Sequence, residues 1–329
     1  MSKAESAVDW QPACSLELLH LRARMLSTVR AFFAQRDVLE VETPGLYPYT
    51  NPEPMIEGFE VPKSSGGTEC FYLQTSPEFA MKRLLAAGSG AIYQICKAYR
   101  NNESGRYHNP EFTILEWYRP GYTLRQLMQE TEALLTDVLP VSQIPKQAVY
   151  LTYQTVFSEA VNVNPLSGTI GDFERAANTL GYPEAKSICA DDRSAWLDFL
   201  FSHGVQPQLP KQCIVFVYNY PACQSALARL HPQLPEIAER VEVFIDGVEI
   251  GNGFQELTDA EEQRQRFLAQ QAERQRNSLT VSGLDEGFLA ALRAGMPDTA
   301  GIAIGLDRLL MMLSHSERID QVLTFPLKQ

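Results

Sequence analysis

The spacing of apolar residues predicts a long amphipathic helix near the start of the chain. Apolar side chains recur at helical spacing from Leu16 to Arg36, so one face of this segment is expected to pack on a core. Residues 38–43 then alternate as a short strand, which ends at Pro44 because proline cannot donate to a β-ladder. Residues 1–15 are mostly polar, and we interpret them as a tail.

The rest of the chain reads as strands, several of them paired in hairpins, with helices kept apart from them. Strands are predicted at 71–74, 91–100, 112–118, 214–220, 240–245, 248–251 and 302–304. Helices are predicted at 76–87, with Ser76 as N-cap and Pro77 at the first helical position, and at 124–139, 258–277 and 306–314. This order favours an α+β fold with an antiparallel β-sheet flanked by helices. We expect one large domain at 16–329, with a mostly helical insertion at about 152–205.

Composition narrows the class of protein. Of the 329 residues, 45% are hydrophobic and 21% charged, which fits a globular chain. No apolar run could span a bilayer and no secretion signal opens the chain, so we expect a cytoplasmic protein without a membrane partner. The six cysteines form no CxxC pair, so reduced thiols are expected rather than a zinc site or disulfides. The net charge of −12 argues against a large nucleic-acid face.

The first candidate for chemistry is the polar loop at 101–110 and the strand after it. Arg100 ends the strand before the loop, and Glu116 and Tyr118 share one face of the strand that follows. A carboxylate and a phenol on an apolar face are costly unless something pairs with them. They either bond to each other and the backbone or line a pocket for a cationic ligand, and alone they favour the first.

The second candidate is a hairpin turned by Asp246-Gly247. A two-residue turn places Phe244 opposite Glu249 and Glu242 opposite Gly251, so the two glutamates would share a face, roughly 7–8 Å apart. Both could face water, or both could hold Mg²⁺ together with the phosphates of a nucleotide. The glycines at 251 and 253 allow close approach of a ligand, which favours the second interpretation.

The third candidate is a glycine-rich strand that leads into the helix at 306–314. Gly301, Ala303 and Gly305 keep this strand slim, and Arg308 lies in the first turn of the helix. A helix N-terminus with an arginine beside it can receive a phosphate. Taken alone, the same pattern fits a glycine-rich turn with a surface arginine.

Together and in this order, the three segments resemble the catalytic core of class II aminoacyl-tRNA synthetases. The first helix, its strand and Pro44 are similar to motif 1, which implies a homodimer. Arg100 to Phe112 is similar to motif 2, whose arginine holds the α-phosphate of ATP and whose phenylalanine stacks on adenine. Gly305 to Arg308 is similar to motif 3, whose arginine contacts the γ-phosphate.

Within this class the chain is most similar to lysyl-tRNA synthetases, and that resemblance implies roles for particular residues. The amino-acid pocket would consist of Ser76, Pro77, Glu78, Glu116, Tyr118, Asn252, Glu256 and Ala303, with the acidic groups on the amino groups of lysine. Mg²⁺ would be held by Glu242 and Glu249. ATP would be bound by Arg100, Asn101, Asn102, Glu103, His108, Asn109, Phe112, Glu249, Ile250, Gly305 and Arg308, with Arg100 and Arg308 acting in catalysis.

Two departures from that family shape the prediction. Motif 2 usually reads Arg-x-Glu, but here Asn102 takes the third place and Glu103 follows, so the carboxylate is lost or displaced by one residue. Motif 1 begins at about Leu16, which leaves no room for the anticodon-binding domain. The chain thus resembles the truncated paralogues that activate (R)-β-lysine and transfer it to a lysine of elongation factor P. Ala303, where lysyl-tRNA synthetases have glycine, is hypothesised to fit β-lysine.

Alternatives stay open at this point. A truncated lysyl-tRNA synthetase-like enzyme could act on tRNA or another small acceptor. An ammonia-using asparagine synthetase would need a basic pocket, which Glu78, Glu116 and Glu256 contradict. An inactive regulatory paralogue would lack the two motif arginines, although Asn102 speaks for it. The residues leave open whether α-lysine or β-lysine is the substrate, where an acceptor protein docks, and which base serves the transfer step.

Overall fold

The computed structural model describes residues 10–63, 70–140, 142–144 and 146–327, and nine strands of this part form one large sheet. The strand order is β1-β5-β6-β12-β11-β10-β8-β7, with β9 beside β10. All pairings are antiparallel except β1 with β5 and β7 with β8, so the predicted α+β fold is confirmed. The strands are β1 (Leu39–Glu40), β5 (Ile92–Tyr99), β6 (Glu111–Pro120), β7 (Val149–Thr152), β8 (Ile214–Pro221), β9 (Leu230–His231), β10 (Leu234–Ile245), β11 (Val248–Gln255) and β12 (Thr299–Gly305).

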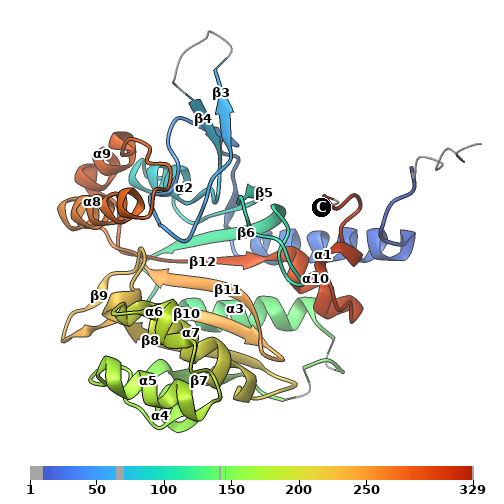
Figure 1. Cartoon of the computed structure of the whole chain (residues 1–329). Helices are drawn as coiled ribbons and strands as arrows, with labels where there is room; N and C mark the ends of the chain where they lie inside the picture. The colour runs from blue at the N-terminus through green and yellow to red at the C-terminus, as the bar shows by residue number, and fades with distance from the viewer. Residues whose placement is uncertain (1–9, 64–69, 141, 145, 328–329) are drawn as a thin grey trace, which may run out of the picture.

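Three helices cover one face of this sheet and form the main core with it (Figure 1). They are α1 (Leu16–Ala34), α3 (Leu124–Val138) and α10 (Leu306–Ser314). The apolar stripe predicted for the first helix is buried at Met25, Val29, Phe32 and Phe33. Phe33 stacks on Tyr93 of β5, with ring centroids 4.4 Å apart, so the helix is fixed against the sheet.

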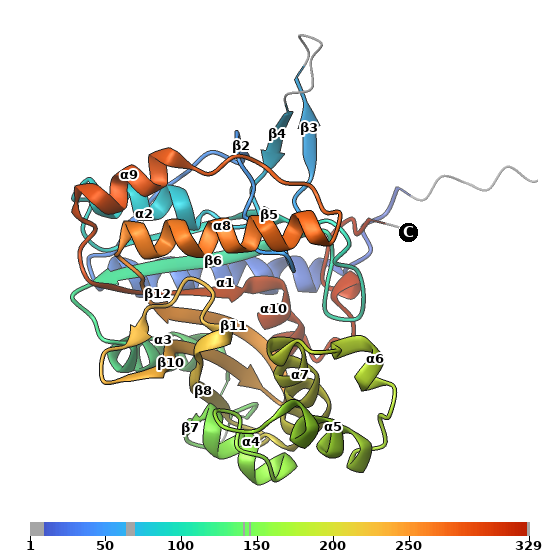
Figure 2. The ribbon, with the colours of Figure 1, turned by 60° about the vertical axis from the view of Figure 1, so that its left-hand side comes forward.

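The other face carries two separate blocks of helices, which pack at opposite ends of the sheet (Figure 2). One block contains α4 (Tyr153–Val161), α5 (Ile170–Thr179), α6 (Ala185–Cys189) and α7 (Arg193–Leu200), continued by π-helical and 3-10 turns to Gln208. The other contains α2 (Glu78–Ala86), α8 (Ala260–Arg276) and α9 (Glu286–Gly295). A small sheet of β2 (Leu46–Tyr47), β4 (Cys70–Leu73) and β3 (Glu60–Pro62) stands beside the second block. The blocks leave the middle of this face open for a site.

Most predicted elements are present, and their ends need small corrections. The helix predicted from Ser76 begins at Glu78, with Pro77 in the N-cap position, although the Ser76 hydroxyl still accepts the N–H of Glu78 at 3.0 Å. The predicted register of the hairpin is wrong beyond the first two pairs. A β-bulge shifts it by one residue, so Glu242 lies opposite Asn252 rather than Gly251.

Some features escaped the sequence patterns. Helix α9 and strands β2, β3, β7 and β9 were not predicted. The strand predicted at 38–43 is paired only over β1, and residues 1–9 of the predicted tail lie outside the described residues. All six cysteines are free thiols. Within the described ranges, no helix combines the length and apolar character that crossing a bilayer requires.

Candidate active site

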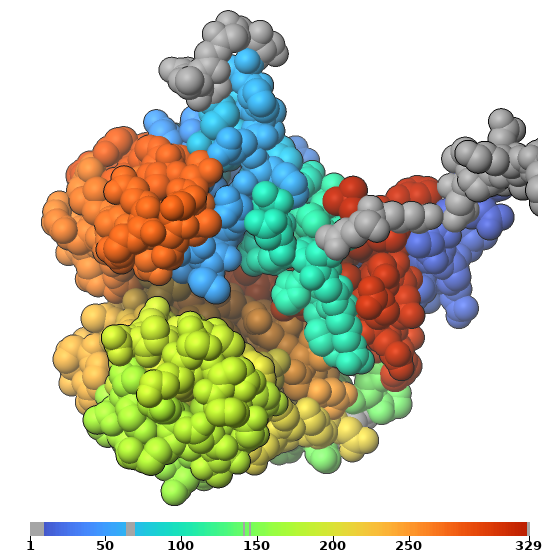
Figure 3. Space-filling view, viewed as in Figure 1, coloured from blue at the N-terminus to red at the C-terminus, as the bar shows by residue number. Residues whose placement is uncertain are grey.

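A cleft of about 1160 Å³ crosses the open face of the large sheet. Figure 3 shows it as the hollow between α8 above and the layer of α4–α7 below. One end is lined by the loop after β5 and the start of α10, and the other by β6, β11 and the start of α2. The three candidate segments of the sequence therefore meet in one cavity.

Arg100 and Phe112 lie together at the first end of the cleft. The Arg100 guanidinium carbon is 5.1 Å from the Phe112 ring centroid, and its Nη1 is 3.5 Å from the Glu103 carboxylate. Glu103 therefore stands where the shifted motif suggested a displaced carboxylate. The contacts that described residues make with the guanidinium are weak, and they include an Nε–H bond of 3.4 Å to the carbonyl of Thr75. The guanidinium is thus free to bind an anionic group in the cleft.

Arg308 reaches the same end because the start of α10 is anchored to two other elements. The buried Asp307 carboxylate accepts the backbone N–H of Thr113 on β6 at 2.6 Å, and Arg22 of α1 at 2.5 Å. With its helix fixed in this way, Arg308 donates to the carbonyl of Glu249 at 2.8 Å and contacts Nε2 of His108 at 2.8 Å. Its position is therefore set before any ligand arrives.

His108 is neutral in this arrangement. Burial, and then the charge of Arg308, lower the pKa of His108 below its ordinary value. Because an arginine can only donate, Nε2 of His108 accepts and the ring proton belongs on Nδ1. The family resemblance implied that His108 contacts ATP, and in the structure His108 lines the cleft.

The remaining loop residues divide into two groups. Within the described part of the chain, Glu103, His108 and Asn109 line the cleft, whereas Asn101 and Asn102 do not. Asn102 has a left-handed φ of 63°, and its backbone N–H bonds to the side chain of Asn101. The amide of Asn109 donates to the carbonyl of Glu111 at 2.6 Å, which ties the loop to its own strand.

Glu242 and Glu249 both line the cleft, as the hairpin predicted, but the bulge is what arranges the residues around them. The extra residue, Ile250, turns into the main core. The shift brings Asn252 opposite Glu242, onto the face that bears the two glutamates. A regular hairpin would have turned Asn252 away from the cleft.

Arg240, which sequence reasoning missed, is the counter-ion of Glu242. Its Nη2 is 2.5 Å from the Glu242 carboxylate, and its Nε donates to Asn252 at 3.1 Å. Burial raises the pKa of Glu242 to about 7, against the attraction of Arg240 and with added repulsion from Glu249. The available signal was spacing: Arg240 is two residues before Glu242 on the same strand and shares its face.

The two glutamates fit a divalent cation, because a cation would offset the burial that chiefly raises the pKa of Glu242 and the repulsion from Glu249 that adds to it. No group of three or more His, Cys, Asp or Glu side chains that could hold a metal occurs in the described ranges. Mg²⁺ is commonly held by one or two carboxylates plus phosphates and water, so a pair is sufficient.

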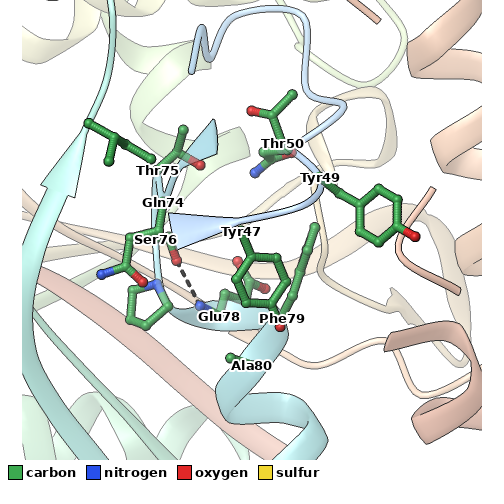
Figure 4. Close-up of a pocket in the computed structure, with 12 residues that line it drawn as sticks. Tyr47, Tyr49, Thr50, Gln74, Thr75, Ser76, Glu78, Phe79 and Ala80 are labelled. Atoms are coloured by element: carbon green, nitrogen blue, oxygen red, sulfur yellow. Dashed lines mark hydrogen bonds between the residues drawn. The ribbon is translucent and has the colours of Figure 1, made fainter. Parts of the chain in front are cut away.

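The second end of the cleft contains a hydrogen-bonded set around Glu116. Its carboxylate accepts the Ser76 hydroxyl at 2.6 Å and the Tyr118 hydroxyl at 3.1 Å. Burial, with repulsion from Glu78, raises the pKa of Glu116 to about 7, although both hydroxyls oppose the shift. Figure 4 shows Ser76 beside the N-terminal end of α2, where its oxygen accepts the N–H of Glu78. Glu116 and Tyr118 are therefore bonded to each other, as the sequence favoured, and they also line the cleft.

Glu78 and Glu256 meet at this end through Lys82, a residue that sequence reasoning also missed. Lys82 Nζ is 2.5 Å from the Glu78 carboxylate and 2.6 Å from that of Glu256. The lysine is fully buried, with an exposed fraction of 0%. Lys82 follows Glu78 by four residues on one helix, a spacing that could have pointed to the pair.

Strand β12 supplies the floor between these groups. Ala303 lies opposite Glu116 on one side and Asn252 on the other, and it lines the cleft. At Gly301 an added Cβ would come within 2.3 Å of the Tyr118 ring and 2.6 Å of the Glu256 carboxylate. Glycine at 301 therefore lets Tyr118 and Glu256 approach each other.

Comparison with known proteins gives one consistent result. Residues 4–329 match the family described as tRNA synthetases class II (D, K and N). The chain is 44% identical to the elongation factor P–(R)-β-lysine ligase of Photobacterium profundum, over 97% of this chain and 98% of that protein. It is 45% identical to the Edwardsiella ictaluri protein of the same name, over 96% and 97%, and 44% identical to the Vibrio cholerae one, over 97% and 98%.

Proposed function

Because this chain belongs to the class II tRNA synthetases of the D, K and N group, we propose that it is an ATP-dependent ligase that activates (R)-β-lysine. It transfers the activated amino acid to the ε-amino group of a lysine on elongation factor P. The relatives that bear this activity in their names match nearly the whole chain at 42–45% identity.

One observation carries the proposal: the two ends of the cleft have opposite chemistry. Two cationic groups, Arg100 and Arg308, lie at one end beside the Phe112 ring. Three carboxylates, those of Glu78, Glu116 and Glu256, converge at the other beside Tyr118. Nucleotide phosphates fit the first end and the ammonium groups of a diamino acid fit the second. A member that activates aspartate would need an excess of positive charge where the carboxylates lie, whereas the single ammonium of Lys82 is already paired with two of them.

The first reaction joins the amino acid to the nucleotide. An oxygen of the amino-acid carboxylate attacks the α-phosphorus of ATP, the bond to the β-phosphate oxygen breaks, and pyrophosphate leaves. Arg100 holds the α-phosphate, Arg308 the γ-phosphate, and Phe112 stacks on adenine, so the chain acts by alignment and charge neutralisation. Glu242 and Glu249 would hold Mg²⁺, which neutralises phosphate charge when bound.

The second reaction transfers the amino acid. The amine of the acceptor lysine attacks the carbonyl carbon of the adenylate, the bond to the phosphate oxygen breaks, and AMP leaves while the amine gives up a proton. The cleft is open along the side between α6–α7 and α8, which offers a path for the acceptor side chain (Figure 3).

We extend the proposal to assembly and location. The chain forms a homodimer through α1 and the segment that follows it, acts in the cytoplasm, and uses residues 16–329 as one catalytic domain with the helical layer as an insertion. Gel filtration with light scattering tests the dimer. A mass near that of one 36.9 kDa chain would contradict it.

ATP–pyrophosphate exchange tests the activity directly. We expect exchange with (R)-β-lysine, less with α-lysine, and none with aspartate. The adenylate is then offered to elongation factor P, tRNA and ammonia, and we expect transfer to elongation factor P alone. Exchange only with aspartate, or transfer only to tRNA, would overturn the proposal. No exchange with any amino acid would leave the inactive regulatory paralogue as the better explanation.

A further inference from the structure

The buried ammonium of Lys82 sets the charge of the amino-acid end of the cleft. Glu78, Glu116 and Glu256 carry three formal negative charges when ionised, and Lys82 cancels one of them. The (R)-β-lysine substrate brings two ammonium groups to this end. The two negative charges that remain on the protein therefore balance the two ammonium groups of the ligand, which is the condition for taking these groups out of water without an unpaired charge.

Lys82 acts on the ligand only through its two partners. It has no exposed surface, and both glutamates stand within 2.6 Å of its Nζ. Burial alone would lower the pKa of Lys82, but Glu256 and Glu78 raise it above its ordinary value, so it stays charged. Its ammonium is enclosed by α2 and by α9, where the Phe288 ring centroid is 6.0 Å away.

The same contact fixes where the carboxylates point. One Glu256 oxygen pairs with Lys82, while another lies in the gap that Gly301 leaves beside Tyr118. Burial and repulsion from Glu78 and Glu116 raise the pKa of Glu256 to about 8, and Lys82 works against that rise. Without the lysine, the buried Glu256 and the partly exposed Glu78 would face each other with no cation between them.

We propose that Lys82 is a positioning residue that determines specificity for diammonium amino acids, by fixing Glu78 and Glu256 and cancelling one of their charges. This inference rests on the proposed activation of (R)-β-lysine.

A double-mutant cycle separates this role from a merely structural one. Lys82→Met leaves three carboxyl groups without their cation, which is three formal negative charges when all are ionised, and removes the fixed geometry. We expect it to raise the KM for (R)-β-lysine in pyrophosphate exchange by on the order of tenfold, the equivalent of one charged hydrogen bond. The KM for ATP should not change, because the phosphate end is untouched. Lys97→Met, which removes a half-exposed lysine paired with Glu111 at 3.3 Å, is the matched control and should change neither constant.

In the second half of the cycle, removal of Lys82 is expected to lower the KM for (R)-β-lysine rather than to raise it. With the remaining carboxylates ionised, Glu256→Gln alone leaves one negative charge, too few for two ammonium groups, and adding Lys82→Met restores two. The double variant should therefore have a lower KM for (R)-β-lysine than Glu256→Gln alone. This comparison stands even if Lys82→Met by itself does not fold, because the double variant replaces both members of the fully buried Lys82–Glu256 pair by neutral groups. The other partner, Glu78, is 14% exposed and keeps contact with water.

Two outcomes would overturn the inference. One is that Lys82→Met raises the KM for (R)-β-lysine by the same factor in the wild type and in the Glu256→Gln variant. The other is a folded Lys82→Met enzyme with the wild-type KM. Wild-type exchange is measured first: if it does not depend on a diamino acid, the proposed function itself has failed, which a failure of the cycle alone would not imply.

Discussion

The guanidinium of Arg240 lies 2.5 Å from the carboxylate of Glu242, on the face of the sheet where the metal ligands were predicted. The pair is mostly buried, with 17% and 14% of the two side chains exposed. Arg240 thus supplies a positive charge to a carboxylate that also faces Glu249. Mg²⁺ at the proposed site would compete with Arg240 for Glu242 or share it, so the binding of the metal would be energetically coupled to the arginine.

We expect Arg240→Gln to destabilise the fold and to make it depend on Mg²⁺. Breaking a buried pair leaves an uncompensated charge, which costs about 3 kcal/mol. Urea unfolding should show this loss of unfolding free energy in the absence of Mg²⁺. Added Mg²⁺ should restore part of it, and should stabilise the variant more than it stabilises the wild type.

Arg229→Gln is the matched control for that measurement. Arg229 pairs with Glu239, which lies on β10 like Arg240, and with Asp298 at 3.0 Å. These pairs are more exposed and lie away from the cleft. Its loss should cost less than about 1 kcal/mol and be insensitive to Mg²⁺. Equal losses in the two variants would argue against a special role for Arg240.

Arg100→Gln should remove activity while sparing stability. Among the described residues, the guanidinium has contacts of 3.4 Å and 3.5 Å and lies 5.1 Å from the Phe112 ring centroid, all of them weak, so the free energy of unfolding should change little. Loss of a preorganised charge at the α-phosphate should lower kcat for pyrophosphate exchange by about a hundredfold or more. Arg106→Gln in the same loop is the control, because Arg106 donates to the carbonyl of Glu317. A kcat close to that of the control would contradict the assignment of Arg100.

The apo protein should lose stability as pH rises from about 5 to 7. Burial raises the pKa of Glu116 from 4.5 to about 7, so between these values the folded state holds a proton that the unfolded state has released. The free energy of unfolding then falls as pH rises, by at most about 1.4 kcal/mol per pH unit for one group. Glu242 and Glu256 act in the same direction, since their pKa values are raised to about 7 and about 8.

Glu116→Gln isolates this contribution, because glutamine does not titrate. Thermal melting between pH 5 and 7 should show a smaller decline for this variant than for the wild type. His108, whose pKa is lowered, opposes the trend only where its unfolded form takes up a proton, below about pH 6.5. Glu111→Gln, at a half-exposed carboxylate of the same strand, should keep the wild-type decline. An unchanged slope in Glu116→Gln would show that this carboxyl is ionised in the apo protein.

The sequence predicted the framework well because periodicity and turn signals are local. The amphipathic stripe of α1, the Asp246-Gly247 turn and the step from β12 to α10 each lie within one short segment. Prediction failed where the outcome depends on distant residues. The bulge at Val243/Phe244 follows from Ile250 entering the core, and α9 is stabilised by packing on α2.

The residues of the candidate site also divide into those that the sequence located and those that it did not. Residues of the predicted set that meet in the cleft were located by family motifs, but their counter-ions were not. Arg240 and Lys82 read as ordinary charged residues of a strand and a helix. Spacing places Arg240 near Glu242 and Lys82 near Glu78, but it does not show that the two cations are largely buried. Only folding brings Lys82 against Glu256 as well, because that glutamate comes from a distant segment that no local pattern connects to α2.

The methyl group of Ala303 gives the sharpest test of substrate choice. It lies on the cleft floor between Glu116 and Asn252, so it fills space that a ligand amino group could otherwise occupy. Ala303→Gly should raise exchange with α-lysine relative to (R)-β-lysine by roughly tenfold, the scale that one methyl group sets for discrimination. Ala300→Gly, on the same strand but fully buried in the main core, is the control for the added flexibility of glycine and should leave that ratio unchanged. If both variants gave the same ratio of α-lysine to β-lysine exchange, the floor of the cleft would not select between them, and the orientation of the carboxylates around Lys82 would be the next determinant to vary.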